Sequence, residues 1–235
     1  MLHRFFVAVP LLLNTPLFAE PLSCILEPSL DVFVGAPVEG VVERVEVDRA
    51  DIVKRGQLLA QLQAGVEQAA VNTQAAREAY ARRRIERTEE LQQGQLMSQQ
   101  ELDDIRIEYE LARLELAERR EQLRIRRITS PIEGVVVERF HDPGNLIQKE
   151  HLLRIMQLDP LHVEVVLPVE YFGSMKVGER RAVWLQHLDS IHEAKVVVVD
   201  RIVDAASSTF RVRLALPNPN YSIPSGLRCE INLTQ

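Results

Sequence analysis

The chain has 235 residues, 46% of them hydrophobic and 26% charged, which is the composition of an ordinary globular protein of one or two domains. Its formal net charge of −6 and its aromatic content of 5% argue against nucleic-acid binding, because nucleic-acid-binding domains usually present a basic face or an aromatic stacking platform.

Residues 1–19 have the pattern of a secretory signal peptide. The basic start MLHR precedes the apolar run FFVAVPLLL, and the small residue Ala19 comes just before the expected cleavage site. An uncleaved anchor is one alternative, but it needs about 20 apolar residues and Pro10 interrupts this shorter run. A lipoprotein signal ending at Cys24 is another, but a proline three positions earlier fits it poorly. We therefore expect export to the periplasm.

A short sequence pattern occurs twice, 94 positions apart. APVEGVVERVEV starts at Ala36 and SPIEGVVVERF at Ser130, so that Gly40 aligns with Gly134. Further along, DIV aligns with NLI and one leucine pair with another, without a gap. β-Branched residues in short runs favour strands, and a single copy is too small to bury its own apolar face. The repeat therefore predicts one β-sandwich built from two separate halves.

The segment between the two copies has the composition of a pair of helices. It contains no proline and is rich in Ala, Glu, Gln, Arg and Leu, which favour helix. Gly94 marks the expected bend, and Ser98 followed by Glu101 is the capping-box pattern that begins a second helix. The segment is therefore predicted to form an antiparallel helical hairpin.

Heptad spacing predicts the face on which the two helices meet. The seam of the second helix is expected at Leu102, Ile105, Tyr109, Ala112, Leu116 and Leu123, with Arg119 as the exception. The first helix is less regular: Ala69, Ala76 and Ala79 keep the spacing, and Arg83 then breaks it.

The rest of the chain is predicted to form a small β-barrel. Short β-rich runs after Pro160 alternate with the turn-forming sequences KVGE, PNPN and PSG. Residues 25–34, ahead of the first repeat copy, are expected to add a strand to this barrel. Cys24 and Cys229 lie near opposite ends of the exported chain. They are either bridged, which export permits, or two small buried apolar residues.

The order of strand, half-sandwich, hairpin, half-sandwich and barrel resembles that of the periplasmic adaptor, or membrane fusion, proteins of bacterial tripartite efflux pumps. Several stretches are similar to family sequence: DIVKRGQLL, ITSPIEGVV, DPGNLI, FRVRLALPNPN and IPSGL. The resemblance implies an elongated α+β fold with a split lipoyl-like β-sandwich, an antiparallel coiled-coil hairpin and a small β-barrel. The expected boundaries are 1–19 for the signal peptide, 20–34 for the first barrel strand and its lead-in, 35–63 and 128–158 for the lipoyl-like halves, 64–127 for the hairpin and 159–235 for the barrel.

The sequence departs from the family at three places. Ser208 stands where the tail of the family commonly has arginine. Ala50 stands where the turn of the first copy usually has glycine, although Gly144 is present in the second copy. The predicted last strand also ends close to Gln235. We therefore expect no further membrane-proximal domain, although many family members bound to RND-type pumps have one.

The resemblance also implies a partner-binding site at the tip of the hairpin. The family has an arginine, a leucine four residues later and a serine seven residues after that, and Arg87, Leu91 and Ser98 hold these positions here. In the family they dock onto an outer-membrane channel of the TolC type. A guanidinium group suits partner carboxylates or carbonyls, and a leucine suits an apolar pocket. The competing interpretation is a solvated arginine and a serine that only caps the helix.

No catalysis and no cofactor are expected. A biotin or lipoyl carrier presents its modifiable lysine between the two halves, whereas here the hairpin occupies that place and Lys54 and Lys149 lie elsewhere. His187 and His192 are not part of a cluster with metal-ligand spacing, so no metal site is expected either.

The expected function is that of an adaptor that bridges an inner-membrane transporter, most simply of the RND type, and a TolC-like outer-membrane channel. The family forms rings of six copies, so self-association is expected, and nucleic acid is not an expected partner. One alternative is an adaptor of an ABC-driven type I secretion or export system. Another is an extracytoplasmic binding or metal-handling module.

Overall fold

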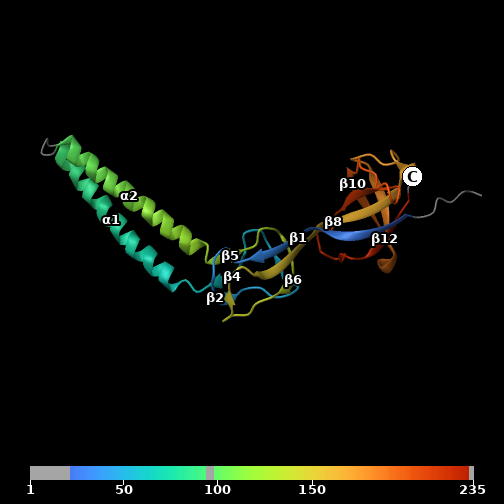
Figure 1. Ribbon diagram of the computed structural model, residues 1–235, viewed down its shortest axis with the longest axis horizontal. Helices are drawn as coiled ribbons and strands as arrows, with labels where there is room; N and C mark the ends of the chain where they lie inside the picture. The colour runs from blue at the N-terminus through green and yellow to red at the C-terminus, as the bar shows by residue number, and fades with distance from the viewer. Residues whose placement is uncertain (1–21, 94–97, 233–235) are drawn as a thin grey trace, which may run out of the picture. The chain divides into compact units, whose positions relative to one another are not determined.

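The computed structural model describes residues 22–93 and 98–232, and the predicted signal peptide lies outside this part of the chain. The described residues form two compact units. One unit, residues 28–159, contains a β-sandwich and a helical hairpin; the other, formed by the residues before Pro28 and after Asp159, contains a β-barrel (Figure 1). The predicted fold class, with a split sandwich, an antiparallel hairpin and a small barrel, is confirmed.

The sandwich has the internal symmetry that the repeat predicts. Its strands are β2 (Gly40–Val45), β3 (Ile52–Val53), β4 (Leu58–Leu62), β5 (Arg127–Thr129), β6 (Gly134–Arg139) and β7 (Leu146–Ile147), with parts of the long strands β1 (Leu22–Gly35) and β8 (His151–Pro168). β6 and β7 begin 94 positions after β2 and β3. Both β1 and β8 are shared, since each has residues in both units.

The two copies of the repeat are paired crosswise. β3 of the first copy pairs with β6 of the second, with Ile52 opposite Val135. β7 of the second copy pairs with β2 of the first, with Leu146 opposite Val41. Each copy therefore supplies the hydrogen-bonding partner that the other lacks, which explains why the pattern occurs twice in one chain.

A single hydrophobic core joins the two copies. Equivalent residues from both copies are buried together, among them Val42 with Val136 and Val53 with Ile147. The complete buried set is Val34, Val42, Val47, Val53, Leu59, Ala60, Leu62, Ile128, Ile132, Val136, Ile147, Leu152, Leu153 and Ile155. Because neither copy can form this core alone, the sandwich closes only when both ends of the intervening hairpin return to it.

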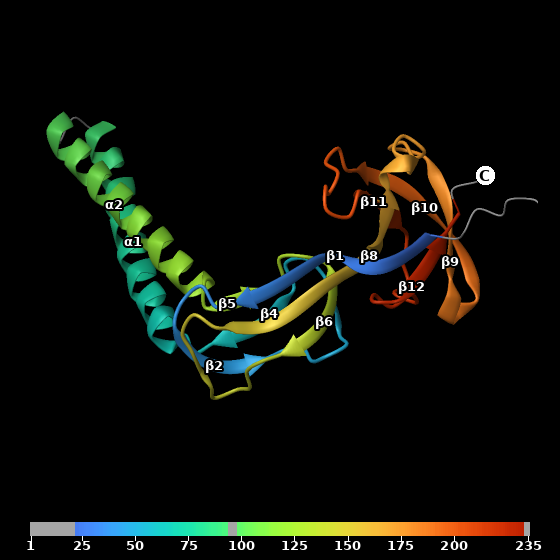
Figure 2. The same cartoon turned by 45° about the vertical axis from the view of Figure 1, so that its right-hand side comes forward.

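The intervening segment forms two antiparallel helices, α1 (Gly65–Gln93) and α2 (Gln99–Arg124), which lie side by side (Figures 1 and 2). The predicted seam of α2 is confirmed. Leu102, Ile105 and Leu116 are buried, Tyr109, Ala112 and Leu123 are half-buried, and Arg119 is exposed. Within the described residues, no helix combines the length and the apolar character that a membrane crossing needs.

The predicted seam of α1 was wrong in register. Ala69 and Ala76 are exposed and Ala79 is half-buried, whereas the buried residues are Gln74, Ala81 and Thr88, spaced seven apart. Two of these three side chains are polar and the third is small. The half-buried Val71 and Ile85 keep the same three- and four-residue spacing, but the polar Gln74 and Thr88 interrupt the apolar pattern, so that pattern alone could not reveal the seam.

The polar seam residues of α1 are tolerated because each has a hydrogen-bonding partner. The amide of Gln74 donates to Oε2 of Glu115 across the interface at 2.5 Å. The hydroxyl of Thr88 donates to the backbone carbonyl of Arg84 at 2.8 Å. The hairpin therefore combines an apolar seam on α2 with a mixed seam on α1 whose buried polar side chains are hydrogen-bonded.

The second unit is the predicted barrel. It contains β9 (Arg180–Leu185), β10 (Ser190–Val199), β11 (Thr209–Leu216) and β12 (Arg228–Ile231), with short 3-10 turns at Val169–Tyr171 and Gln186–Leu188. The strand order is β1-β12-β9-β10-β11-β8, and β1 also pairs with β8, which closes the barrel. Along β8, the fully buried residues Leu161, Val163, Val165 and Leu167 alternate with more exposed ones, as expected for a strand with one face on a core.

Candidate partner-binding site

The candidate site is the end of the hairpin where α1 stops and α2 begins. Residues 94–97, including the predicted bend at Gly94, lie outside the described part of the chain, and so does the side chain of Leu91. Arg87 and Ser98 are described and both are exposed. The site can therefore be built from these two residues and from the polar side chains below them on α1 and α2.

Ser98 forms the predicted capping box. Its hydroxyl accepts a hydrogen bond from the backbone N–H of Glu101 at 3.3 Å, and Oε2 of Glu101 accepts one from the backbone N–H of Ser98 at 3.1 Å. The Ser98 hydroxyl also donates to the same carboxylate oxygen at 2.8 Å. The hydrogen bonds that this carboxylate accepts, from the Ser98 hydroxyl and from the Ser98 backbone N–H, lower the pKa of Glu101 below its ordinary value. The serine therefore fixes where α2 begins.

Arg87 projects from the last turns of α1 as an exposed side chain. Its Nε donates to the backbone carbonyl of Arg83 at 3.3 Å, which holds the side chain along the helix. Within the described residues, no carboxylate forms an ion pair with it. The remaining N–H groups of this planar guanidinium group lie at the exposed surface of the hairpin.

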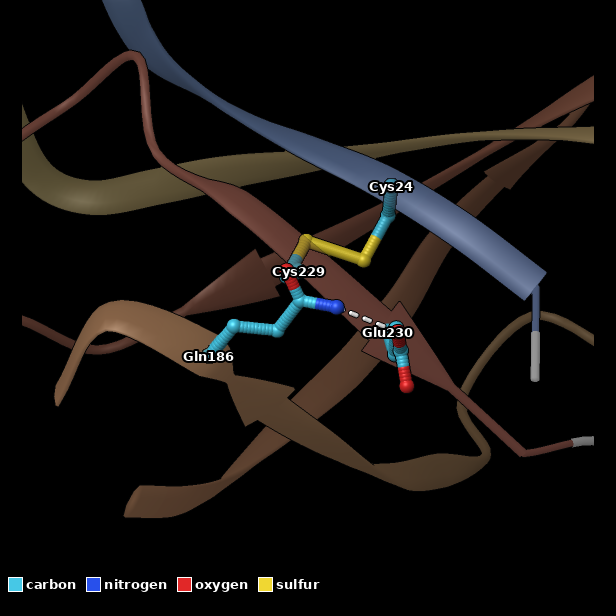
Figure 3. Close-up of a disulfide and its surroundings, with 4 residues drawn as sticks. All are labelled: Cys24, Gln186, Cys229 and Glu230. Carbon is cyan, nitrogen blue, oxygen red and sulfur yellow. Dashed lines mark hydrogen bonds between the residues drawn. A yellow bond between two sulfur atoms is a disulfide. The ribbon is translucent and has the colours of Figure 1, made fainter. Parts of the chain in front are cut away.

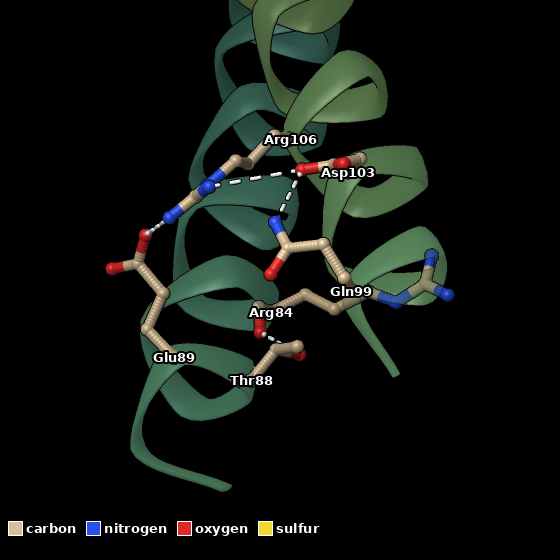
Figure 4. A network of polar contacts seen from close by, with 6 residues as sticks. All are labelled: Arg84, Thr88, Glu89, Gln99, Asp103 and Arg106. Atoms are coloured by element: carbon tan, nitrogen blue, oxygen red, sulfur yellow. Dashed lines mark hydrogen bonds and ion pairs between the residues drawn. The ribbon is translucent and has the colours of Figure 1, made fainter. Parts of the chain in front are cut away.

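A polar network joins the two helices just below this end (Figure 4). Arg106 of α2 lies 3.1 Å from Glu89 of α1 and 3.8 Å from Asp103 of its own helix. The amide of Gln99 donates to the same Asp103 carboxylate at 3.1 Å. Exposed ion pairs of this kind each contribute roughly 0–1 kcal/mol, so the network sets the relative position of the helix ends more than it stabilises them.

Apolar packing supports the network from inside. Leu102 and Ile105 are buried in the first two turns of α2, and the methyl-bearing Thr88 is buried opposite them in α1. One helical turn further down, the guanidinium of Arg84 pairs with the carboxylate of Glu108. The exposed residues at the end of the hairpin therefore stand on a fixed two-helix base.

Arg126 fixes the opposite end of the hairpin to the sandwich. Its guanidinium lies 2.6 Å from the carboxylate of Glu67 in the first turn of α1 and donates to the carbonyl of Glu39, just before β2, at 2.8 Å. Its own carbonyl accepts from the N–H of Leu62 in β4 at 2.9 Å. The start of α1, the segment after α2 and the sandwich are thus joined through one side chain.

The structure puts Arg87 and Ser98 at the same end of the hairpin without bringing them into contact with each other. Sequence reasoning missed the polar network that surrounds them. Asp103 and Arg106 have the three-residue spacing of a helical ion pair, which is a signal for their contact. The contact of Arg106 with Glu89 has no such signal, because it crosses between the helices.

Cys24 and Cys229 are joined by a disulfide in the structure (Figure 3). They stand opposite each other on the paired strands β1 and β12, with their Cα atoms 4.8 Å apart. Beside them, the Gln186 amide donates to the carboxylate of Glu230. The bridge lies in the barrel unit and serves its architecture, since neither cysteine is exposed.

One family model matches more than half of the chain, and several known proteins are similar to it. Residues 31–156 match the family described as CzcB-like, barrel-sandwich hybrid domain. The multidrug resistance protein MdtA of Xenorhabdus bovienii is 26% identical over 213 residues, covering 80% of this chain and 52% of that protein. The multidrug/solvent efflux pump periplasmic linker protein MepA of Pseudomonas putida is 26% identical over 211 residues, covering 83% of this chain and 55% of that protein.

A solved structure has the same fold. The MacA–MexA chimeric protein, which contains the Pseudomonas aeruginosa MexA α-hairpin domain, superimposes with a TM-score of 0.76 at 22% identity. The superposition covers 92% of this chain and 82% of the chimera. The chain spans about half the length of the curated relatives that it matches.

Proposed function

The chain belongs to the family of periplasmic adaptor, or membrane fusion, proteins, whose CzcB-like barrel-sandwich hybrid domain it contains, and we propose that it is the adaptor subunit of an efflux pump. One observation supports this proposal above the others. The helical hairpin is inserted between the two halves of the sandwich, and its far end presents an exposed arginine on a fixed base. Such an element suits contact with another protein better than it suits catalysis.

The partners follow from the same proposal. The hairpin end, through Arg87, Leu91 and Ser98, would dock on an outer-membrane channel of the TolC type, and several copies would surround the exported substrate in a ring. The inner-membrane partner would be a transporter of the RND type. Relatives named as efflux pump linkers support this role, and the periplasm is the corresponding location.

The test of the tip is the substitution Arg87→Asp in cells that lack the native gene. Export should be lost, because the reversed charge would face whatever acceptors now attract the guanidinium. The stability of the purified protein should change by less than about 0.5 kcal/mol, since the side chain is exposed. Export is measured as intracellular accumulation of a panel of dyes and antibiotics, at matched expression.

Two further variants make this test specific. Arg119→Asp is the matched control, because Arg119 is an exposed arginine of the same hairpin near its sandwich end, and it should export normally. Leu116→Ala should lower the stability of the hairpin by about 2 kcal/mol, since it removes a buried seam residue. Normal export with Arg87→Asp would refute the docking role and leave Arg87 as a solvated helix residue.

The energy source can be tested in the same cells. Export through an RND-type partner should stop when a protonophore collapses the proton gradient and should continue in the presence of vanadate. The opposite pattern would indicate the ABC-driven alternative.

A further inference from the structure

The two chain segments that join the hairpin to the sandwich differ in how firmly they are held. On the α2 side, the backbone N–H of Arg126 still donates to the carbonyl of Leu123 in the last turn of the helix, at 3.2 Å. The carbonyl of Arg126 accepts from the N–H of Leu62 in β4 at 2.9 Å, and β5 begins at the next residue. α2 therefore passes into the sheet through backbone hydrogen bonds without a break.

The α1 side has no such continuity. The N–H of Gln63 donates to the carbonyl of Val41 at 2.9 Å, and α1 begins two residues later at Gly65. A Cβ atom at Gly65 would meet no other segment of the described chain within 4 Å, and the next residue, Val66, is 81% exposed. The first two residues of α1 therefore contribute little packing that would fix the direction of the helix.

Glu67 supplies the contact that these two residues lack. Its side chain is 20% exposed, and its carboxylate lies 2.6 Å from Nη2 of Arg126, whose side chain is 21% exposed. Nη1 of the same guanidinium donates to the carbonyl of Glu39, just before β2, at 2.8 Å. One terminal nitrogen thus binds the first turn of α1 and the other binds the sandwich. The planar fork of an arginine can span both, whereas a lysine offers one ammonium group.

The first copy of the repeat leaves room for this guanidinium at Gly40. A Cβ atom at Gly40 would lie 2.7 Å from Nη1 of Arg126. The equivalent glycine of the second copy, Gly134, instead faces the backbone of Met156. The two equivalent glycines therefore serve different contacts, and the glycine of the first copy serves the base of the hairpin.

We propose that Arg126 is a positioning residue, which keeps the hairpin from turning at residues 64–65. Because α2 continues into β5, a change in the direction of the hairpin has to open the α1 side, and the ion pair with Glu67 holds that side closed. A hairpin fixed in this way loses less entropy when its far end docks, and it passes movements of the sandwich on to Arg87. The inference deepens the proposed adaptor function and rests on it.

Pulsed electron double resonance on the full-length protein measures the freedom of the hairpin. Spin labels are attached to p-acetylphenylalanine, which leaves the native cysteines untouched, in place of the exposed residues Arg55 in the sandwich and Arg82 in α1. In Arg126→Gln and in Glu67→Gln, the distribution of this distance should widen by about twofold or more, because released hinge residues take up several conformations.

Two internal label pairs separate a turning hairpin from a loosened fold. One pair, Arg55 and Asn145, lies within the sandwich, and the other, Arg82 and Ala117, lies within the hairpin; all four residues are exposed. Both internal distributions should keep their widths in the variants. A residue that only stabilised the fold would widen the internal distributions too.

The chain offers a matched control two residues from Arg126. Arg124 pairs with Glu121 inside α2, and both side chains are exposed, so Arg124→Gln should leave all three distributions unchanged. Arg126→Lys keeps the charge but loses the fork, and its distribution between Arg55 and Arg82 should be intermediate in width.

Export in cells extends the test to function. At matched expression, Arg126→Gln and Glu67→Gln should lower export, whereas Arg124→Gln should export normally. A distribution that stays narrow in both glutamine variants of the pair, or internal distributions that widen with it, overturns the positioning role. A widened distribution with normal export overturns the part of the proposal that concerns export.

These outcomes are distinguishable from failure of the adaptor proposal itself. If the hairpin stays fixed without the ion pair and Arg87→Asp still abolishes export, the docking role stands and the positioning role of Arg126 falls. If Arg126→Gln frees the hairpin and Arg87→Asp exports normally, the docking role falls and the contact at the base still fixes the hairpin.

Discussion

Ala50 and Gly144 occupy equivalent positions in the two halves of the sandwich, and both have a left-handed backbone, with φ of 75° and 93°. Their amides make equivalent hydrogen bonds of 2.8 Å, Ala50 to the carbonyl of Val136 and Gly144 to the carbonyl of Val42. Glycine adopts this conformation freely, whereas a residue with a Cβ atom is strained by about 1–2 kcal/mol. The crosswise pairing of the repeat thus forces the same turn on two different residues.

Ala50→Gly should therefore stabilise the sandwich. Relief of the strain exceeds the extra entropy that glycine gives the unfolded chain, and a net gain of about 0.5–1 kcal/mol is expected. Hydrogen exchange at the amides of Val42 and Val136 measures the opening free energy of this unit. Gly144→Ala is the reciprocal change and should lower it by a similar amount. Equal exchange rates in all three proteins would contradict the assignment of strain to Ala50.

Gly40 and Gly134 are equivalent in sequence but not in surroundings. A Cβ atom at Gly134 would lie 2.8 Å from the backbone carbonyl carbon of Met156 and closer still to its oxygen. At Gly40 it would meet the side chains of Arg126 at 2.7 Å and Leu62 at 3.2 Å. A side chain can move aside more easily than a paired strand.

Gly134→Ala should therefore lower the opening free energy of the sandwich by at least about 2 kcal/mol, which is within the range for overpacked cores. Gly40→Ala should lower it by about 1 kcal/mol or less. The same hydrogen-exchange measurement compares the two variants. A larger loss of opening free energy for Gly40→Ala than for Gly134→Ala would show that the close approach of β8 to Gly134 is not a constraint on the fold.

The disulfide between Cys24 and Cys229 should stabilise the barrel. The bridge closes a loop with a sequence separation of 205, and replacing both cysteines by serine should cost about 2–4 kcal/mol. Trp184 is the single tryptophan and lies in β9, so its fluorescence reports the unfolding of this unit. Thiol titration of the periplasmically produced protein under denaturant should find no free thiol. Two free thiols would refute the bridge.

His162 should make the barrel less stable as the pH falls. Burial and the neighbouring Arg213 lower the pKa of this half-buried histidine from its ordinary value of 6.5. Between that value and the depressed pKa, the unfolded chain binds a proton that the folded chain does not, so folding free energy is lost as the pH falls below 6.5.

His162→Gln removes this titration and should flatten that part of the curve. The measurement is denaturant unfolding followed by Trp184 fluorescence at a series of pH values on either side of 6.5. If the variant and the unchanged protein lose stability in parallel, His162 is not responsible for the pH dependence.

Much of the architecture could be predicted from the sequence because it depends on local periodicity. The repeat around Gly40 and Gly134 indicated a sandwich in two halves, and the composition between them indicated two helices. The cap at Ser98 and the apolar seam from Leu102 to Leu116 were also visible, since each depends on residues a few positions apart.

The tertiary structure alone decided the features that depend on contacts between distant segments. The seam of α1 uses Gln74 and Thr88, and their burial is tolerated only because a partner helix and a backbone carbonyl accept their hydrogen bonds. The opposition of Cys24 and Cys229 depends on the register of β1 against β12, which no local pattern specifies. Periodicity shows which face of an element is buried; what lies against that face is fixed only when the elements pack.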